Sequence, residues 1–189
     1  MATVERGEHE RFLEIRVADG DLGGVVAGLV PAHECRLSPA ECEHLAREVA
    51  SRGLWEGVDL TPTESQTRAY ALLYEDERME MWLLSWLPHH STGFHDHGES
   101  SVGFCVAQGA LVERHLRFAE QPRAETLVAG DGRAAGCDYI HCLEWETGAP
   151  ALSVHVYSPP LTVVGQYRYD ADGVLHRRSQ PGRDELTKD

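Results

Sequence analysis

The sequence lacks the features that mark membrane, secreted and nucleic-acid-binding proteins. No apolar run approaches the roughly 20 residues needed to cross a bilayer. The polar, acidic first residues contain no hydrophobic core of a secretory signal. Lys and Arg total 17 against 31 Asp and Glu, and the formal charge of −14 disfavours nucleic acid and anionic membranes as partners. We therefore expect a cytoplasmic protein, with an oligomeric state that the sequence does not specify.

The cysteines also lack the spacing of a structural framework. There are five, an odd number, and none forms a Cys-x-x-Cys pair, which argues against paired disulfides and a zinc ribbon. Apolar residues make up 42% of the chain and charged residues 25%, as in globular proteins. At 189 residues the chain can form one domain with a substantial core, so we expect a single domain over residues 1–189.

The first 60 residues have a helical pattern. Ser38, Pro39 and Glu41 occupy the N-cap, N1 and N3 positions of a capping box, which predicts a helix start. An apolar stripe at helical spacing follows and ends near Gly53; its members are Cys42, Leu45, Ala46 and Val49. A weaker helix is expected over residues 22–29. We expect these helices to cover the outside of a sheet.

From about residue 67 the pattern changes to short β-strands separated by turn signals. Strands are expected at residues 68–74, 79–86, 101–107, 110–118, 125–128, 139–143, 151–157 and 165–169. Strands this short and regularly spaced favour a β-sandwich or small barrel over βαβ units. The expected fold class is mainly β with amino-terminal helices, a β core over residues 67–170 and a flexible tail over residues 180–189.

One histidine pair is a candidate metal site. His95 and His97 are two residues apart, so on a strand both side chains point to the same face and both imidazoles can reach one metal ion. Imidazole ligands suit iron, copper, nickel or zinc. The chain has 11 histidines, so the pair is also compatible with a purely structural role. His141, in another expected strand, is the candidate third ligand, and Asp96 should face away from the metal.

A second candidate group lies on the expected strand at residues 151–157. Ser153, His155 and Tyr157 share one face and can form a hydrogen-bonded row, whereas Val154 and Val156 point to the other face. The row is either a functional group beside the metal or a buried polar ladder that satisfies its own hydrogen bonds.

Together these motifs resemble the cysteine dioxygenase family of cupins. The resemblance covers about residues 67–161 and depends on Trp86, His95-Asp96-His97, Gln108-Gly109, His141 and the block from Ser153 to Pro160. It implies a cupin-type β-sandwich or barrel in which His95, His97 and His141 bind one Fe(II) ion. Most cupins add a carboxylate ligand four or five residues after the histidine pair. Ser101 and Val102 occupy those positions and cannot replace it, while Glu99 lies too early.

The same resemblance implies roles for residues around the iron. Tyr157 would act on the oxygen as a proton or hydrogen-bond donor, with His155 and Ser153 orienting it. Val102 stands where vertebrate members carry a cysteine cross-linked to this tyrosine, so Tyr157 is expected to be an unmodified phenol. We expect Trp86 to pack in the core.

Two further residues concern the substrate. By the resemblance, Arg68 would hold a substrate carboxylate, for which a planar, permanently charged guanidinium is well suited. The alternative is an exposed arginine at a strand end. Gln66 replaces a tyrosine that usually lies two residues before the arginine, which alters the substrate side of the pocket.

The expected function is that of an Fe(II)-dependent dioxygenase, which uses O₂ to convert a small carboxylate-bearing thiol such as cysteine to its sulfinic acid. A small-molecule thiol and O₂ are thus the expected partners. Alternative substrates are 3-mercaptopropionate and a thiohistidine such as ergothioneine. A metal-binding cupin of another enzyme class and a non-catalytic ligand sensor also remain open.

Overall fold

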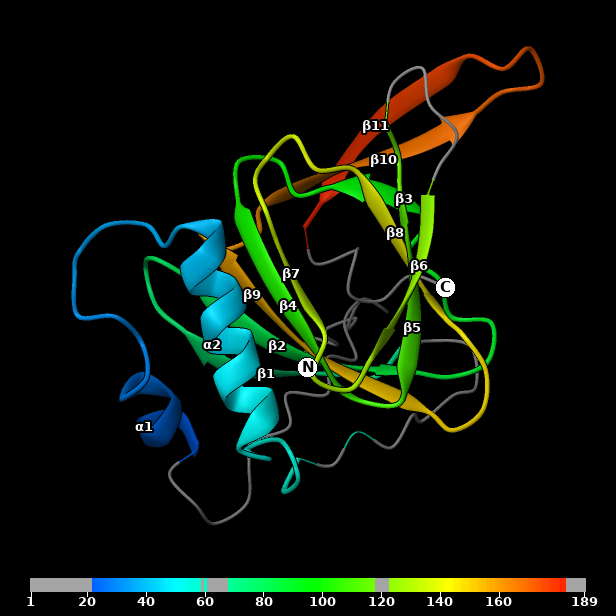
Figure 1. Ribbon diagram of the computed structural model, residues 1–189. Coiled ribbons are helices and arrows are strands. Elements are labelled where there is room, and N and C mark those ends of the chain that lie inside the picture. Colours follow the sequence, from blue (N-terminus) through cyan, green and yellow to red (C-terminus); the bar gives the residue numbers. More distant parts are fainter. Residues whose placement is uncertain (1–21, 59, 61–67, 118–122, 183–189) are drawn as a thin grey trace, which may run out of the picture.

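Two antiparallel β-sheets lie face to face, with two helices against the outer side of one of them (Figure 1). The computed structural model describes residues 22–58, 60, 68–117 and 123–182. The first sheet has the strand order β1 (Tyr70–Glu75), β2 (Glu80–Trp86), β9 (Ala151–Ser158), β4 (Ser101–Gln108) and β7 (Gly132–Ala135). The second has the order β11 (Leu175–Pro181), β10 (Val163–Tyr169), β3 (Phe94–Asp96), β8 (His141–Trp145), β5 (Ala110–His115) and β6 (Arg123–Val128).

The helices are α1 (Leu22–Ala27) and α2 (Pro39–Ser51), and α2 begins with the predicted capping box. The Glu41 N–H donates to Ser38 Oγ at 3.3 Å, and the Ser38 N–H donates to Glu41 Oε2 at 2.8 Å. Donation to the Glu41 carboxylate by the Ser38 hydroxyl (2.7 Å) and by the Ser38 N–H lowers the pKa of Glu41 to about 2. The predicted stripe of α2 is buried against the first sheet, so the helix covers that sheet's outer face, as expected (Figure 1).

The first sheet is buried on both faces: one face packs against the helices, and the other faces the second sheet. Along β9, Val154 and Val156 face the layer under α2, whereas Tyr157 faces the space between the sheets. Along β2, Trp82 and Trp86 likewise face inward. Strands that are buried on both faces are usually apolar throughout. Polar residues on the inner face of this sheet are therefore candidates for a functional role.

The mainly β fold with amino-terminal helices is confirmed, but three strands, β3, β7 and β11, were not among the expected strand ranges. β7 is short, and β11 extends the sheet beyond residue 170 by pairing along the whole of β10. Gln180 and Pro181, placed by sequence in a flexible tail, belong to β11. Residues 183–189 and 1–21 lie outside the described residues. Within the described part, no helix is long and apolar enough to cross a membrane.

The close approach of α2 to β4 depends on Gly103. A Cβ atom at this position would lie 1.9 Å from the Glu43 backbone nitrogen and 2.2 Å from the Cys42 carbonyl carbon. Both neighbours are backbone atoms of the helix and cannot rotate away. The absence of a side chain at residue 103 therefore sets the distance between helix and sheet.

Gly103→Ala should accordingly lower the free energy of unfolding by about 1–3 kcal/mol, the usual effect of overpacking a core. Gly57→Ala is the matched control, because a Cβ at residue 57 meets no atom within 4 Å. Urea unfolding followed by circular dichroism measures both. Equal stability of the Gly103→Ala variant and the wild-type protein would contradict this packing constraint.

Candidate metal centre

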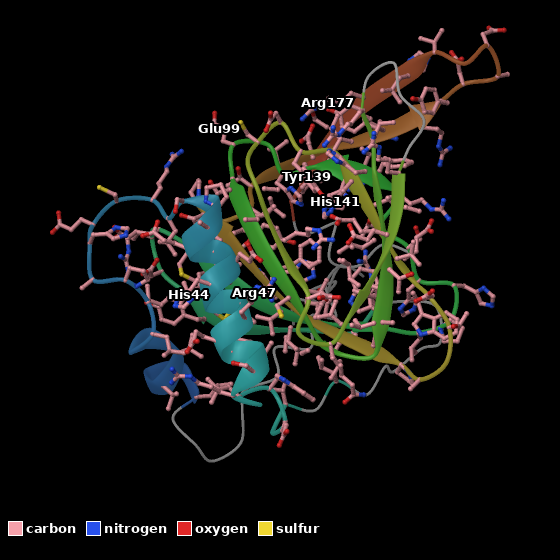
Figure 2. The ribbon with its side chains drawn as sticks, in the orientation of Figure 1. His44, Arg47, Glu99, Tyr139, His141 and Arg177 are labelled. Carbon is pink, nitrogen blue, oxygen red and sulfur yellow. The ribbon has the colours of Figure 1, made fainter. Side chains whose placement is uncertain are left out.

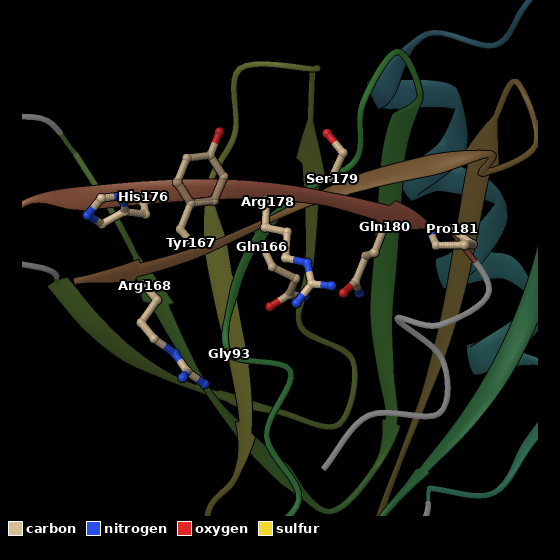
Figure 3. A pocket seen from close by; sticks show the side chains of 9 residues that line it. All are labelled: Gly93, Gln166, Tyr167, Arg168, His176, Arg178, Ser179, Gln180 and Pro181. Carbon is tan, nitrogen blue, oxygen red and sulfur yellow. The ribbon is translucent and has the colours of Figure 1, made fainter. Parts of the chain in front are cut away.

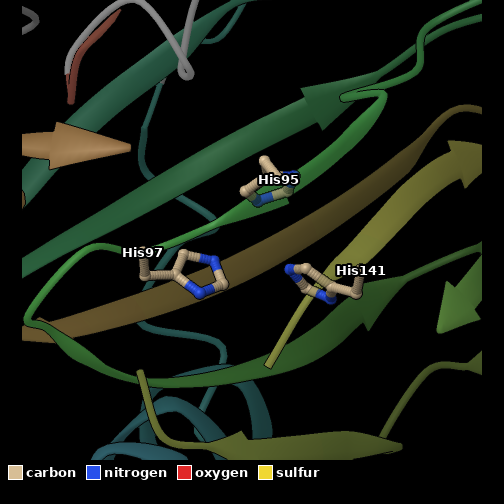
Figure 4. A group of neighbouring side chains, drawn as sticks. All are labelled: His95, His97 and His141. Carbon is tan, nitrogen blue, oxygen red and sulfur yellow. The ribbon is translucent and has the colours of Figure 1, made fainter. Parts of the chain in front are cut away.

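Three histidines from two strands of the second sheet converge between the sheets (Figure 4). His95 lies in β3, His97 directly follows that strand, and His141 begins β8, where its Cα pairs with that of His95. One nitrogen from each ring lies within 4.8 Å of the others. Each residue is at most 2% exposed. The structure therefore brings together the three ligand candidates named from the sequence.

Local structure on either side of the strand fixes the direction of this histidine pair. Gly98 ends the segment with φ of +59°, and a Cβ there would lie 2.4 Å from the Val163 carbonyl oxygen. Asp96 points to the opposite face, as predicted. Its carboxylate accepts hydrogen bonds from the Gly165 N–H (2.9 Å), Tyr167 Oη (2.8 Å) and Arg177 Nε (2.7 Å). Anchoring Asp96 outward leaves His95 and His97 facing inward.

Hydrogen bonding determines which ring nitrogens face the centre of the group. His95 Nδ1 lies 3.1 Å from the Gly93 carbonyl oxygen, and His141 Nδ1 lies 2.8 Å from Glu113 Oε1. Their Nε2 atoms therefore remain available to a metal. Burial lowers the pKa of His97 and of His141 well below the usual value, so both rings are neutral. Neutral imidazole is the form that binds metals, and the donor set fits a divalent transition metal.

Among the described residues, no carboxylate joins the three imidazoles in this group. Glu99 is exposed and lies outside the barrel, well away from His141 (Figure 2). Val102 is buried, and its Cα pairs with that of Tyr157 across β4 and β9. A cysteine at residue 102 would thus stand opposite the tyrosine, but valine offers no sulfur for a cross-link.

The polar row on β9 faces the same interior space. Ser153, His155 and Tyr157 are at most 4% exposed. Ser153 Oγ lies 2.8 Å from His155 Nε2, and His155 Nδ1 lies 3.3 Å from the Tyr157 hydroxyl. The Tyr157 ring centroid is 5.6 Å from that of His97. The row therefore ends beside the candidate metal ligands.

The direction of donation along this row follows from Trp86. Its indole Nε1–H can only donate, and it donates to Ser153 Oγ at 2.8 Å. The serine hydrogen is then directed to His155 Nε2, which leaves the proton of the neutral imidazole on Nδ1, facing Tyr157. Burial lowers the pKa of His155 well below its usual value, consistent with a neutral ring. The Tyr157 hydroxyl oxygen thus accepts a hydrogen bond from His155 Nδ1, and its own hydrogen can be donated to another group in the interior.

Arg68 is buried at 2% exposure, which contradicts the alternative of an exposed strand-end arginine. Its guanidinium carbon lies 4.7 Å from the centroid of the Trp86 ring, a cation–π contact. Trp86 thus contacts both the arginine and the β9 row, so core packing is only part of its role. Gln66 lies outside the described residues.

Sequence reasoning missed Glu113, which is 3% exposed and faces the interior from β5. Burial raises the pKa of its carboxyl, while the hydrogen bond from Tyr139 (2.9 Å) and the charge of Arg133 favour the ionised form. A signal was present in the sequence. Leu111 and Glu113 are two residues apart on one strand, so both side chains point to the same face. The sequence therefore places a charged residue at an inward-facing position where an apolar one is expected.

A polar groove borders the site along β10 and β11 (Figure 3). It has a volume of about 660 Å³, and its lining includes Gln166, Arg168 and Arg178. Gln166 pairs with both His95 and Arg178, so these three side chains lie in one row on the same sheet face. Neither arginine forms an ion pair within the described part of the chain. Among the described residues, the groove thus carries two arginines without an ion-pair partner.

The fold and site together define a metal-dependent cupin. The family model described as cysteine dioxygenase type I matches residues 63–170. This match spans more than half of the chain, and the protein therefore belongs to the cysteine dioxygenase type I family. Its fold and three-histidine site are those of a thiol-dioxygenase-like cupin.

Solved structures of other proteins are also similar to this chain. A protein of Thermus thermophilus is 24% identical with a TM-score of 0.47, over 53% of this chain and 91% of its own. A Klebsiella pneumoniae protein with a double-stranded β-helix domain is 15% identical with a TM-score of 0.45, over 64% of this chain and 91% of its own. KdgF of a Halomonas species is 17% identical with a TM-score of 0.44, over 53% of this chain and 87% of its own.

Proposed function

We propose that the protein is an Fe(II)-dependent thiol dioxygenase that converts a small carboxylate-bearing thiol to its sulfinic acid. In the reaction, RSH and O₂ give RSO₂H, with both oxygen atoms added to sulfur and no other reductant consumed. The observation that carries this proposal is the joint placement of three imidazoles and the Tyr157 hydroxyl in one buried space, with no carboxylate ligand among the described residues. His95, His97 and His141 would hold the iron.

When bound, Fe(II) would supply open coordination positions for a thiolate and O₂ together with the redox chemistry of the oxygenation. The chain's own residues supply position and protons. Arg68 offers a fixed, buried positive charge to the substrate carboxylate, which restricts where the sulfur can lie. Tyr157 offers a hydroxyl proton, and His155 holds the phenol oxygen by donating from Nδ1. Burial of these groups excludes water and strengthens each electrostatic contact.

The basic groove supports an anionic substrate. The chain carries a formal charge of −14, whereas Arg168 and Arg178 line this groove beside the strand of His95 and have no ion-pair partner among the described residues. Arg168 and Arg178 would raise the local concentration of a negatively charged thiol near the site. Cysteine and 3-mercaptopropionate both carry a carboxylate, as does a thiohistidine such as ergothioneine.

Two other functions use parts of the same site. A cupin of another enzyme class could use the three histidines with nickel or zinc, and a ligand sensor could use them without turnover. Both are less well supported, because neither needs a hydrogen-bonded row that leaves the Tyr157 proton available beside the metal ligands.

The test is oxygen uptake by the iron-loaded protein with a panel of thiols: cysteine, 3-mercaptopropionate, ergothioneine and cysteamine. We expect thiol-dependent O₂ consumption with a sulfinate product, fastest for a carboxylate-bearing thiol. Metal analysis of the protein as purified, and loss of uptake after chelation, link the activity to the metal. Absence of thiol-dependent uptake for every compound would refute the proposed function.

Arg68→Lys tests the carboxylate contact, because lysine keeps the charge but loses the planar fork. We expect kcat/KM for the best carboxylate-bearing thiol to fall about 10- to 100-fold, the range for losing a hydrogen bond to a charged group. Cysteamine has no carboxylate and should be oxidised at an unchanged rate. Arg52→Lys, on the exposed side of α2, is the matched control. An equal loss for both substrates would contradict a carboxylate contact.

Tyr157→Phe removes the hydroxyl while retaining the ring. We expect kcat to fall roughly 10²-fold or more if the hydroxyl acts as a positioned acid. Tyr169→Phe serves as the control, since Tyr169 is 50% exposed. Steady-state oxygen uptake at saturating thiol measures both variants, and an undiminished kcat for Tyr157→Phe would remove this role.

A further inference from the structure

The three candidate ligands differ in the hydrogen-bond partner of the ring nitrogen Nδ1. His95 Nδ1 faces a neutral carbonyl, that of Gly93. His97 Nδ1 is buried and has no hydrogen-bond partner in the described part of the chain. His141 Nδ1 alone faces a carboxylate, at 2.8 Å from Glu113 Oε1. Among the described residues, Glu113 therefore brings a carboxylate into direct contact with a candidate ligand, His141.

Glu113 is itself held by several donors. The Tyr139 hydroxyl donates to Oε1 at 2.9 Å, and Arg133 Nε lies 3.2 Å from Oε2. Arg133 also pairs with the exposed Glu125 at 2.6 Å. Burying a carboxylate is unfavourable unless such partners compensate for its lost hydration. These contacts hold the Glu113 carboxyl group in a fixed orientation at the back of His141.

The charge balance of the site gives this contact its significance. Imidazole ligands bring no negative charge, so a divalent metal held by the three histidines would keep its full positive charge inside a desolvated interior, which is unfavourable. A carboxylate ligand would offset it, but Ser101 and Val102 stand where that ligand is expected. Among the described residues, Glu113 is a buried carboxylate in hydrogen-bond contact with a candidate ligand, so one imidazole ring would separate it from a bound metal.

We propose that Glu113 is a positioning residue of the metal centre with two effects. It holds His141 with the proton on Nδ1 and Nε2 turned toward the metal, and it supplies through that ring the negative charge that the ligand set lacks. This inference rests on the metal site of the proposed function but not on the thiol substrate. Arg133 reduces the second effect, because its positive charge lies 3.2 Å from Glu113 Oε2 and partly offsets the negative charge of the carboxylate.

Two substitutions at residue 113 separate the effects. Glu113→Gln retains an acceptor for the His141 Nδ1–H but removes the charge, whereas Glu113→Leu removes both. Co(II) titration of the metal-free protein should give a dissociation constant raised about 10-fold by glutamine and up to about 100-fold by leucine. Glu125→Gln, which alters only the exposed partner of Arg133, should bind Co(II) as the wild-type protein does.

The reduction potential of the bound iron gives an independent measurement. Negative charge stabilises the ferric form, so Glu113→Gln should raise the Fe(III)/Fe(II) midpoint potential and Arg133→Gln should lower it. A purely structural role would lower the melting temperature of the metal-free variants but leave the dissociation constants and potentials unchanged, and would overturn the proposal. Wild-type affinity of Glu113→Gln alone would overturn the charge effect. Failure of the wild-type protein to bind any metal would instead refute the proposed function itself.

Discussion

The space between the two sheets is almost entirely closed to solvent, so the polar side chains there are held mainly by hydrogen bonds within the protein. Ser153 is fully buried, and His155 and Glu113 are at most 4% exposed. An unsatisfied polar group in such a place costs roughly 1–3 kcal/mol. The site is consequently built as chains of donors and acceptors, in which each member determines the orientation of the next.

Two such chains approach the histidine group from opposite sheets. On the first sheet, donation begins at Trp86 and continues through Ser153 and His155 to Tyr157. On the second, Tyr139 and Arg133 donate to Glu113, which accepts from His141. The first chain delivers a proton donor to the interior, and the second delivers negative charge. Because indole and guanidinium groups can only donate, neither chain can reverse its direction.

The sequence predicted those features that depend on neighbours along the chain. The capping box at Ser38 and Glu41 is a local hydrogen-bond pattern, and the shared face of Ser153, His155 and Tyr157 follows from the two-residue period of a strand. Features set by pairing between distant strands were missed. The hydrogen bond from His141 to Glu113 depends on how β5 aligns with β8, and β11 is stabilised by its pairing with β10. No local pattern encodes either alignment.

The pairing of Val102 with Tyr157 changes how the phenol is held in place. A thioether would fix the ring covalently, whereas valine can only pack against it, so the position of Tyr157 depends on non-covalent contacts. Its hydroxyl is fixed by His155, whose ring stacks on Phe104 with centroids 5.2 Å apart, and its ring lies beside His97. Because His155 is oriented by Ser153, and Ser153 by Trp86, the tryptophan positions the phenol through two intervening side chains. The same Trp86 side chain packs against the Arg68 guanidinium, so the arginine and the Tyr157 hydroxyl, two groups with roles in the proposed function, share a single support.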